Sequence, residues 1–186
     1  MLDVRGNHRM TAIVSGLALI PLLAVEGYTI PRIRFHLQLH LFFGFWVMAP
    51  LLLKMASSGW RFLRYYTRNP AFHAAGPPGW GPRLLAPVVV VSTVVLFVSG
   101  IGLWWIGPSS EYGSWFEWHK ASFVVWFFAT AAHVLYHLEE TPREIVEEVR
   151  ARSRGRVTRG GLLLASLLLG LVLAAVLTPV HTGWLD

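Results

Sequence analysis

Long apolar runs, separated by short polar and basic segments, dominate the chain from one end to the other. Five of these runs reach the length of about 20 residues that a helix needs to cross the hydrocarbon core of a bilayer. They cover residues 10–27, 35–56, 84–107, 118–138 and 161–180. The pattern predicts an all-α membrane protein that forms a single transmembrane domain over residues 1–186.

The first apolar run also has a feature of a signal peptide, because Arg5 and Arg9 precede it. A cleaved signal peptide ends in small residues at the cleavage site, and Glu26-Gly27-Tyr28, at the end of this run, is a poor match to such a site. We therefore expect the run to be a retained membrane helix.

The polar segment after the fourth apolar run predicts a short surface helix. Thr141 and Glu144 have the spacing of a capping box, and Pro142 would take the first helical position. We expect this helix to cover residues 142–153 on the cytoplasmic side. Its apolar residues would face the membrane or a partner: Ile145, Val146 and Val149.

The charged residues predict the orientation of the chain. Hydrophobic residues make up 54% of the sequence and charged residues only 14%, yet the net charge is +6. With five crossings, twelve arginines share one side of the membrane: Arg5, Arg9, Arg61, Arg64, Arg68, Arg83, Arg143, Arg150, Arg152, Arg154, Arg156 and Arg159. The other side holds Arg32, Arg34 and Lys120, and Lys54 can extend towards the arginine-rich side.

The positive-inside rule places this arginine-rich side in the cytoplasm. The N-terminus is then cytoplasmic and the C-terminus is outside, in a multi-pass protein of the cell membrane. Topology and contact with the lipid bilayer account for the excess of basic residues. We therefore expect no nucleic-acid partner.

The fifth apolar run contains no ionisable side chain and has small residues at every fourth position. Such a stripe lets helix backbones approach closely. The run is expected to be a packing or partner-binding helix, with the stripe formed by Ser166, Gly170 and Ala174.

Histidine carries the candidate chemistry, because the chain has no cysteine and eight histidines. The absence of cysteine excludes disulfides, thiolate catalysis and cysteine-bound zinc or iron–sulfur clusters. An ionisable ring inside a membrane helix is a functional hypothesis by default. The histidines are His8, His36, His40, His73, His119, His133, His137 and His181.

Helical geometry divides these histidines into two groups by depth. His119 and His133 lie within about 40° of one helix face and about 21 Å apart along the axis. The expected topology places His36, His40 and His119 near the outer surface. It places His133 and His137 near the inner surface, with His8 close by in a cytoplasmic segment.

Two histidine sites stacked across a bilayer suit b-type haem. Its iron accepts one imidazole nitrogen on each face of a flat macrocycle, and the two histidines come from different helices. Two haems at different depths would give electrons a route through the membrane.

Helix-borne histidines spaced 14 residues apart, with further histidines on other helices, resemble the bacterial integral-membrane di-haem cytochromes b. This family includes the cytochrome b subunits of nickel–iron hydrogenases and formate dehydrogenases, and the chain is most similar to its short actinobacterial members. The resemblance covers residues 10–138, and the matching stretches are residues 40–44, 119–123 and 133–137.

The resemblance implies a four-helix transmembrane haem-binding bundle with the fifth helix outside it. It makes His40 and His119 the axial ligands of an outer haem b. His133 or His137 becomes one ligand of an inner haem b. We choose His8 as the second inner ligand, since the first helix starts on the side where the fourth ends.

The sequence departs from the family pattern on the second helix. Lys54 lies fourteen residues beyond His40, and Pro50 lies fourteen residues beyond His36, where the family has a second histidine. The expected haem content is therefore two, or one if the inner site lacks its second ligand. His36 is a further candidate at the outer mouth of the second helix.

The function implied by the resemblance is electron transfer across the membrane. No pair of acid and base residues predicts a substrate pocket, so no catalytic residue is assigned. We expect the chain to be the membrane subunit of an oxidoreductase complex, with substrate chemistry on a redox partner protein. Quinone is a further candidate partner.

Two alternatives from other classes stay open. In the first, the chain is a transition-metal transporter or sensor that uses paired histidines: His36 with His40, and His133 with His137. In the second, it is a haem-free membrane scaffold subunit, in which hydroxyls or backbone carbonyls satisfy the histidines. Candidate hydroxyls lie on the third apolar run: Ser92, Thr93 and Ser99.

Overall fold

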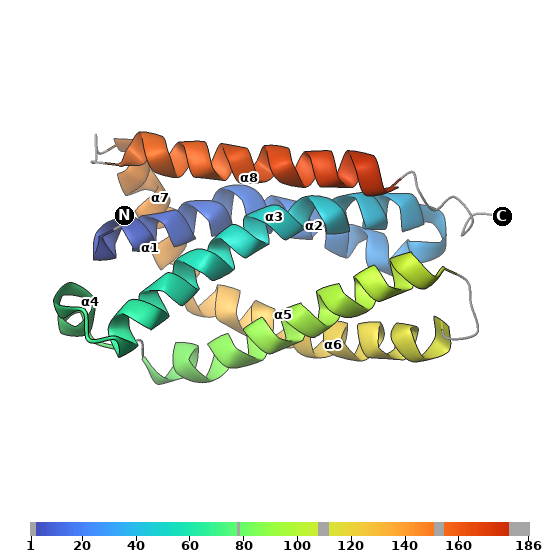
Figure 1. Ribbon diagram of the computed structural model, residues 1–186, viewed down its shortest axis with the longest axis horizontal. Helices are drawn as coiled ribbons and strands as arrows, with labels where there is room; N and C mark the ends of the chain where they lie inside the picture. The colour runs from blue at the N-terminus through green and yellow to red at the C-terminus, as the bar shows by residue number, and fades with distance from the viewer. Residues whose placement is uncertain (1–2, 78, 108–111, 151–154, 179–186) are drawn as a thin grey trace. The chain divides into compact units, whose positions relative to one another are not determined.

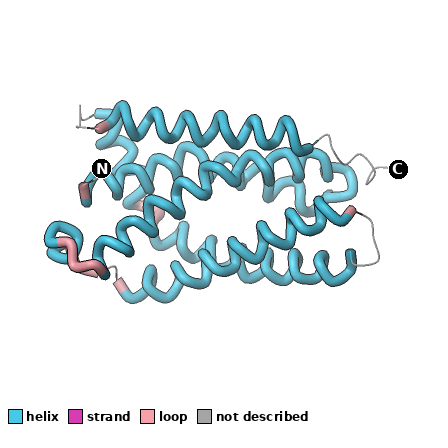
Figure 2. Tube along the Cα trace, in the orientation of Figure 1, coloured by secondary structure: helices cyan, strands magenta, loops and turns pink. Residues whose placement is uncertain are grey.

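The computed structural model describes residues 3–77, 79–107, 112–150 and 155–178. Helix accounts for almost all of these residues, and no strand occurs among them (Figure 2). The predicted all-α class is therefore confirmed. The chain divides into two compact units: unit 1 is Met1–Pro77 with Glu139–Val180, and unit 2 is Pro78–Leu138 with His181–Asp186.

Unit 1 begins with α1 (Val4–Ile13), the π-helical segment η1 (Val14–Leu19) and α2 (Ile20–Thr29), which follow one another without a break. Helix α1 starts earlier than the apolar pattern predicts, because the Asp3 carboxylate accepts a hydrogen bond from the Gly6 amide at 2.6 Å. Such a cap satisfies one of the free amides of the first turn.

A turn then reverses the chain direction within unit 1. It consists of the 3-10 segment η2 (Ile30–Arg32) and the start of α3 (Ile33–Tyr66), where His36 has the non-helical angles φ −122° and ψ 20°. Helix α3 runs back along the first helices as the second leg of a hairpin (Figure 1).

Hydrogen bonds at both ends of the hairpin show that its legs are antiparallel. At one end Asn7 donates to the Ser57 carbonyl at 2.8 Å. At the other end Thr29 lies 3.0 Å from the His40 ring nitrogen. Residues near the start of the first leg therefore meet residues near the end of the second.

Helix α8 (Arg156–Leu177) packs along α3 through its small residues. A Cβ atom on Gly170 would collide with the Trp46 carbonyl, and the Trp46 indole donates to the Leu167 carbonyl at 3.0 Å. Ser166 and Ala174 are also buried. The small-residue stripe is thus confirmed as a close-packing face, while residues 179–180 of the predicted helix lie outside the described residues.

The surface helix α7 (Glu140–Arg150) starts two residues before the predicted 142–153, and residues 151–153 lie outside the described part of the chain. Ile145 packs against the π-helical segment at Gly16, while Val146 and Val149 are exposed. Ile145 is therefore an internal contact of unit 1, not a contact with a membrane or a partner.

The short helix α4 (Pro70–Ala74) follows α3 in unit 1 and was not predicted, although Asn69 at its N-cap and Pro70 at its first position favour a helix start. Unit 2 is a pair of packed helices, α5 (Trp80–Ile106) and α6 (Tyr112–Tyr136) (Figure 1). Trp115 packs on Gly102, and the Trp126 indole donates to the Thr93 hydroxyl at 3.0 Å.

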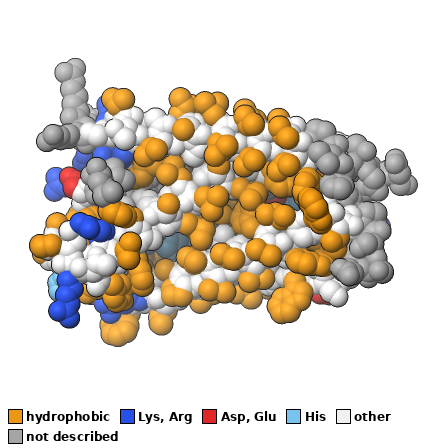
Figure 3. Space-filling model, viewed as in Figure 1, with side chains coloured by type: hydrophobic (Ala, Val, Ile, Leu, Met, Phe, Trp, Pro, Cys, Tyr) orange, Lys and Arg blue, Asp and Glu red, His pale blue; other side chains and the backbone are white. Residues whose placement is uncertain are grey.

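Three helical stretches among the described residues are long and apolar enough to cross a membrane: Val4–Tyr66, Trp80–Ile106 and Arg156–Leu177. A fourth is reached if α6 and α7 are counted together as one bent span. The stretch Val4–Tyr66 includes the hairpin, so it supplies two antiparallel legs. Hydrophobic side chains cover much of the visible surface (Figure 3), as in a membrane protein.

Candidate functional site: two oriented histidines

The first candidate residue, His40, lies inside the hairpin of unit 1 at the end where the chain turns. Its ring nitrogen Nδ1 is 2.8 Å from Oε1 of Glu26 and 3.0 Å from the hydroxyl oxygen of Thr29. Both partners belong to α2, on the opposite leg of the hairpin. The ring is therefore held from one side by a carboxylate and a hydroxyl.

The hydroxyl of Thr29 identifies the protonated nitrogen of His40. This hydroxyl has one hydrogen, and it donates that hydrogen to the Glu26 backbone carbonyl at 2.6 Å. It can therefore only accept a hydrogen bond from the His40 ring. Nδ1 is accordingly assigned as the N–H donor, and in the neutral ring Nε2 has the lone pair.

The second candidate residue, His119, lies in unit 2 and has the same arrangement with different partners. Its Nδ1 atom is 3.1 Å from the Leu96 carbonyl and 3.2 Å from the Ser99 hydroxyl, both on α5. Ser99 donates its own hydrogen to the Val95 carbonyl at 2.7 Å, so it accepts from the ring. His119 thus also has Nδ1–H and an Nε2 lone pair in its neutral form.

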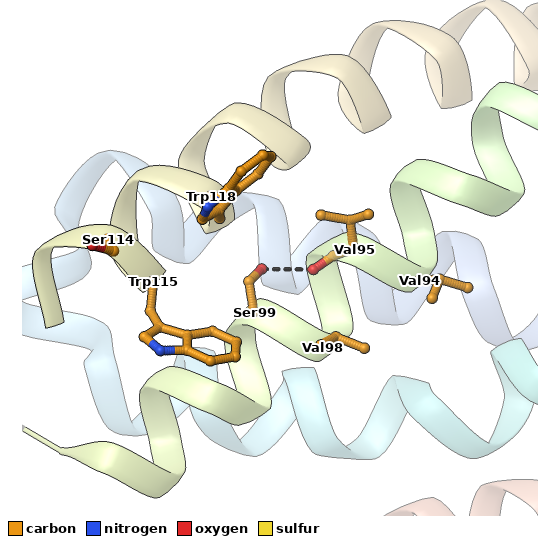
Figure 4. Close-up of a pocket in the computed structure, with 7 residues that line it drawn as sticks. All are labelled: Val94, Val95, Val98, Ser99, Ser114, Trp115 and Trp118. Carbon is orange, nitrogen blue, oxygen red and sulfur yellow. Dashed lines mark hydrogen bonds between the residues drawn. The ribbon is translucent and has the colours of Figure 1, made fainter. Parts of the chain in front are cut away.

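The sequence of α5 leaves room for the His119 ring. A Cβ atom on Gly100 would lie 3.0 Å from the ring carbon Cε1, so glycine lets the ring approach the α5 backbone. Beside Ser99, a mostly apolar pocket of about 460 Å³ opens between α5 and α6. Figure 4 shows its lining: Val94, Val95, Val98, Ser99, Ser114, Trp115 and Trp118.

The remaining histidines have less defined surroundings. The rings of His133 and His137 lie 4.9 Å apart at the end of α6, in unit 2. His36 lies 5.7 Å from the Tyr28 ring, in the turn of the hairpin. His73 stacks on Tyr65 at 5.3 Å and is exposed, and His181 lies outside the described residues.

The chosen second inner ligand, His8, faces a cation. Nη1 of Arg61 lies 3.0 Å from Nε2 and 3.2 Å from Nδ1 of the ring, and a Glu140 oxygen lies 4.0 Å from Nδ1. A guanidinium only donates hydrogen bonds, so the ring nitrogen that bonds to Arg61 accepts. His8 therefore differs from His40 and His119, whose Nδ1 atoms donate.

Each ligand pair expected from the sequence has one histidine in each unit. His40 belongs to unit 1 and His119 to unit 2, and His8 belongs to unit 1 while His133 and His137 belong to unit 2. The pairing itself therefore stays a prediction. Within the described residues, no group of three or more His, Cys, Asp or Glu residues could hold a metal ion.

The sequence analysis missed the contact between Glu26 and His40. The available signal was that Glu26 is a carboxylate within the first apolar helix, which is costly without a partner. Ser99, by contrast, was among the hydroxyls expected to satisfy histidines in a haem-free protein. Its bond to Nδ1 of His119 is compatible with both interpretations, because metal binding would use Nε2.

Lys54 adopts a different position from the expected one. Its ammonium group donates to the Ser15 hydroxyl of the π-helical segment instead of extending towards the arginine-rich side. Ser57 and Thr11 share a further hydrogen bond of 3.1 Å one turn away on the same seam. Lys54 thus belongs to a polar seam inside the hairpin.

A buried carboxylate, Glu148, joins three helices of unit 1. Its oxygens accept bonds of 2.9 and 2.8 Å from Nε and Nη2 of Arg159, a bidentate pair between α7 and α8. Arg9 on α1 lies 3.7 Å from the same carboxylate and 3.1 Å from Glu147. Glu148 and Arg159 are 5% and 2% exposed, so this pair is buried.

Glu144, another acid of this network, has a raised pKa. The loss of hydration raises its pKa above the usual value, and the neighbouring carboxylates Glu147 and Glu140 raise it further. Arg9, which lies 3.7 Å away, and Arg5 oppose this shift of the pKa. The loss of hydration is thus the main cause of the raised pKa of Glu144.

Comparison with protein-family models, curated proteins and solved structures finds no match to the chain.

Proposed function

We propose that the protein is a b-type haem cytochrome that carries electrons across a membrane. The observation that carries this proposal is that His40 and His119 have the same hydrogen-bonding arrangement at Nδ1, each within its own unit. Both rings donate Nδ1–H to fixed acceptors, which leaves Nε2 as the lone-pair nitrogen. A metal-bound histidine has this arrangement, because a hydrogen bond from the other nitrogen fixes the tautomer and the ring orientation.

The donor chemistry of the chain fits haem. It offers imidazole and no thiolate, and haem iron in cytochromes accepts imidazole ligands. In the proposal, His40 and His119 are the axial ligands of the outer haem b. An inner haem b would take His133 or His137 as one ligand and His8 as the other. His36 is a further candidate ligand.

Bound haem would supply one-electron chemistry, and the protein would supply binding and orientation. Glu26, Thr29, Leu96 and Ser99 orient the two proposed ligand rings. Substrate oxidation or reduction then takes place on a redox partner protein, with quinone as another candidate partner.

The proposal places the chain in the cell membrane as a multi-pass protein with a cytoplasmic N-terminus. In unit 1 the start of α1, the end of α3 and the start of α8 lie at the same end. Asn7 on α1 contacts Ser57 on α3, and Glu148 contacts both Arg9 on α1 and Arg159 on α8. Lys and Arg side chains gather at this end (Figure 3). The positive-inside rule favours the cytoplasm for such an end.

The visible spectrum of the purified protein tests the proposal. We expect a Soret band that shifts on reduction with dithionite, and two haems per chain. His40→Ala and His119→Ala should each abolish the outer haem. His73→Ala is the matched control, because His73 is exposed and should leave the spectrum unchanged.

Other outcomes would identify the alternatives. A protein with stoichiometric zinc, copper, nickel or iron and no Soret band would be a metal transporter or sensor. A protein with neither metal nor haem would be a scaffold subunit. A Soret band unchanged by both His40→Ala and His119→Ala would contradict the ligand assignment.

A further inference from the structure

We propose that Glu26 sets the electron-donor strength of His40 and thereby lowers the reduction potential of the iron that His40 binds. This inference rests on the proposed function, since it assigns His40 as an axial ligand. Glu26 would touch neither iron nor porphyrin. It is a positioning residue that acts through the His40 ring.

The first argument is the geometry of the carboxylate. Oε1 of Glu26 lies 2.8 Å from Nδ1 of His40, and the Glu26 side chain is only 15% exposed. Oε2 is buried and has no hydrogen-bond partner within the described part of the chain. The hydrogen bonding of this carboxylate is therefore directed at the His40 ring.

The second argument is the chemistry of the hydrogen bond. Bonds to a carboxylate are shorter and about twice as strong as bonds between neutral groups. A strong acceptor at Nδ1–H draws the proton away from the ring and makes Nε2 a stronger electron donor. A stronger donor favours ferric over ferrous iron, so it lowers the reduction potential.

The third argument is the contrast with His119. Its Nδ1 faces a backbone carbonyl at 3.1 Å and a hydroxyl at 3.2 Å, which are neutral acceptors at longer distances. The two proposed ligands are thus unequal donors. The inequality originates in one residue, Glu26, and can be removed by one substitution.

Thr29 makes this substitution informative. It is fully buried and accepts from the same Nδ1–H at 3.0 Å. In Glu26→Gln the amide oxygen can also accept this bond, because glutamine has nearly the shape of glutamate. The His40 ring should therefore keep its orientation while its partner loses the negative charge.

The test is an equilibrium redox titration and a ferric EPR spectrum of the haem-loaded protein at constant pH. Glu26→Gln should retain haem, shift the potential of one haem to a more positive value and change its ferric g-values. The charge control is Glu117→Gln, which removes an exposed carboxylate that pairs with Lys120 at 2.7 Å. The control should leave the g-values unchanged.

The outcomes separate this inference from the proposed function. A parent protein without haem overturns both. A parent protein with haem, whose potential and g-values do not change in Glu26→Gln, overturns the role of Glu26 alone. If Glu26→Gln loses haem, the reduction potential is measured in Glu26→Asp, whose shorter side chain moves the carboxylate away from the His40 ring. A positive shift of the haem potential supports the proposal, and an unchanged potential overturns it.

Discussion

Two carboxylates of unit 1, the buried Glu148 and the half-buried Glu26, have opposite surroundings. Both oxygens of Glu148 are bonded to Arg159, and Arg9 adds a third interaction. Glu26 has one oxygen at the His40 ring and the other without a hydrogen-bond partner among the described residues. The first carboxylate is neutralised by arginine, and the second faces a group that can also bind a metal.

We interpret Glu148 as a structural charge, whereas the proposed function gives Glu26 a role at the His40 site. Glu148 links α1, α7 and α8, so its loss removes the bidentate carboxylate partner of the buried Arg159. The Glu26 carboxylate contacts His40, and a hydrogen bond to a charged group contributes about 1.5–3 kcal/mol net, which is less than the loss of about 3–5 kcal/mol when a buried ion pair is broken. A carboxylate without full hydrogen bonding in an apolar helix lowers stability, and such a residue is therefore a candidate for a functional role.

The largest expected effect on the free energy of unfolding is at Glu148. Glu148→Gln removes the negative charge between Arg159 and Arg9 and should lower the free energy of unfolding by about 3–5 kcal/mol. Chemical unfolding in detergent micelles, followed by circular dichroism, measures this loss. Glu147→Gln is the matched control: Glu147 is 62% exposed, so its loss should cost no more than about 1 kcal/mol. Equal losses would contradict the assignment of Glu148 as the link.

The next largest effect on the free energy of unfolding is expected at Asn7, which joins the polar seam of the hairpin at Ser57. Asn7 is fully buried and donates to both the carbonyl and the hydroxyl of Ser57. Asn7→Ala removes both of these buried hydrogen bonds and should cost about 1–3 kcal/mol. The same unfolding measurement applies, and Thr67→Ala, an exposed hydroxyl on α3, should have little effect.

At the other end of the hairpin the effect on stability should be small. Glu26→Gln retains an oxygen that accepts from His40, so the free energy of unfolding should change by less than about 1 kcal/mol. The comparison with Glu148→Gln is made on protein without haem. A loss as large as that of Glu148→Gln would show that Glu26 is a structural charge as well.

The smallest effect is a pH dependence at Glu144. Its pKa is raised in the folded protein, so the folded state binds more protons than the unfolded state between the usual pKa and the raised pKa. Stability should therefore fall as pH rises through this window and stay level above it. Glu144→Gln should remove this slope, which a series of unfolding curves from acid to neutral pH would detect. Glu139→Gln, an exposed acid paired with Arg143, should retain the slope.

Much of the helical framework could be predicted, because it depends on local properties. The predicted segments 35–56 and 84–107 lie within or close to α3 and α5, and the stripe at Gly170 is a contact face. The predicted helix boundaries were less accurate where a single side chain determines where a helix begins, as Asp3 does at the start of α1. The π-helical segment η1 and the short helix α4 have no comparable signal in the apolar pattern.

The candidate site was predicted only in part. His40 and His119 could be named because a histidine on an apolar helix is rare and costly. Their partners could not be named from spacing alone. Glu26 precedes His40 by fourteen residues, and the turn through η2 and His36 determines that the two side chains meet.

The amino-acid sequence by itself determined which segments are apolar helices, where their charged ends lie and which helices carry histidine. These properties follow from hydropathy and from residue type, which act locally along the chain. Only the tertiary structure decided that Glu26 faces His40, that Glu148 faces Arg159 and that Lys54 turns to Ser15. Such pairs depend on the register and rotation of packed helices, to which many side chains contribute at once, and a one-dimensional pattern does not specify them.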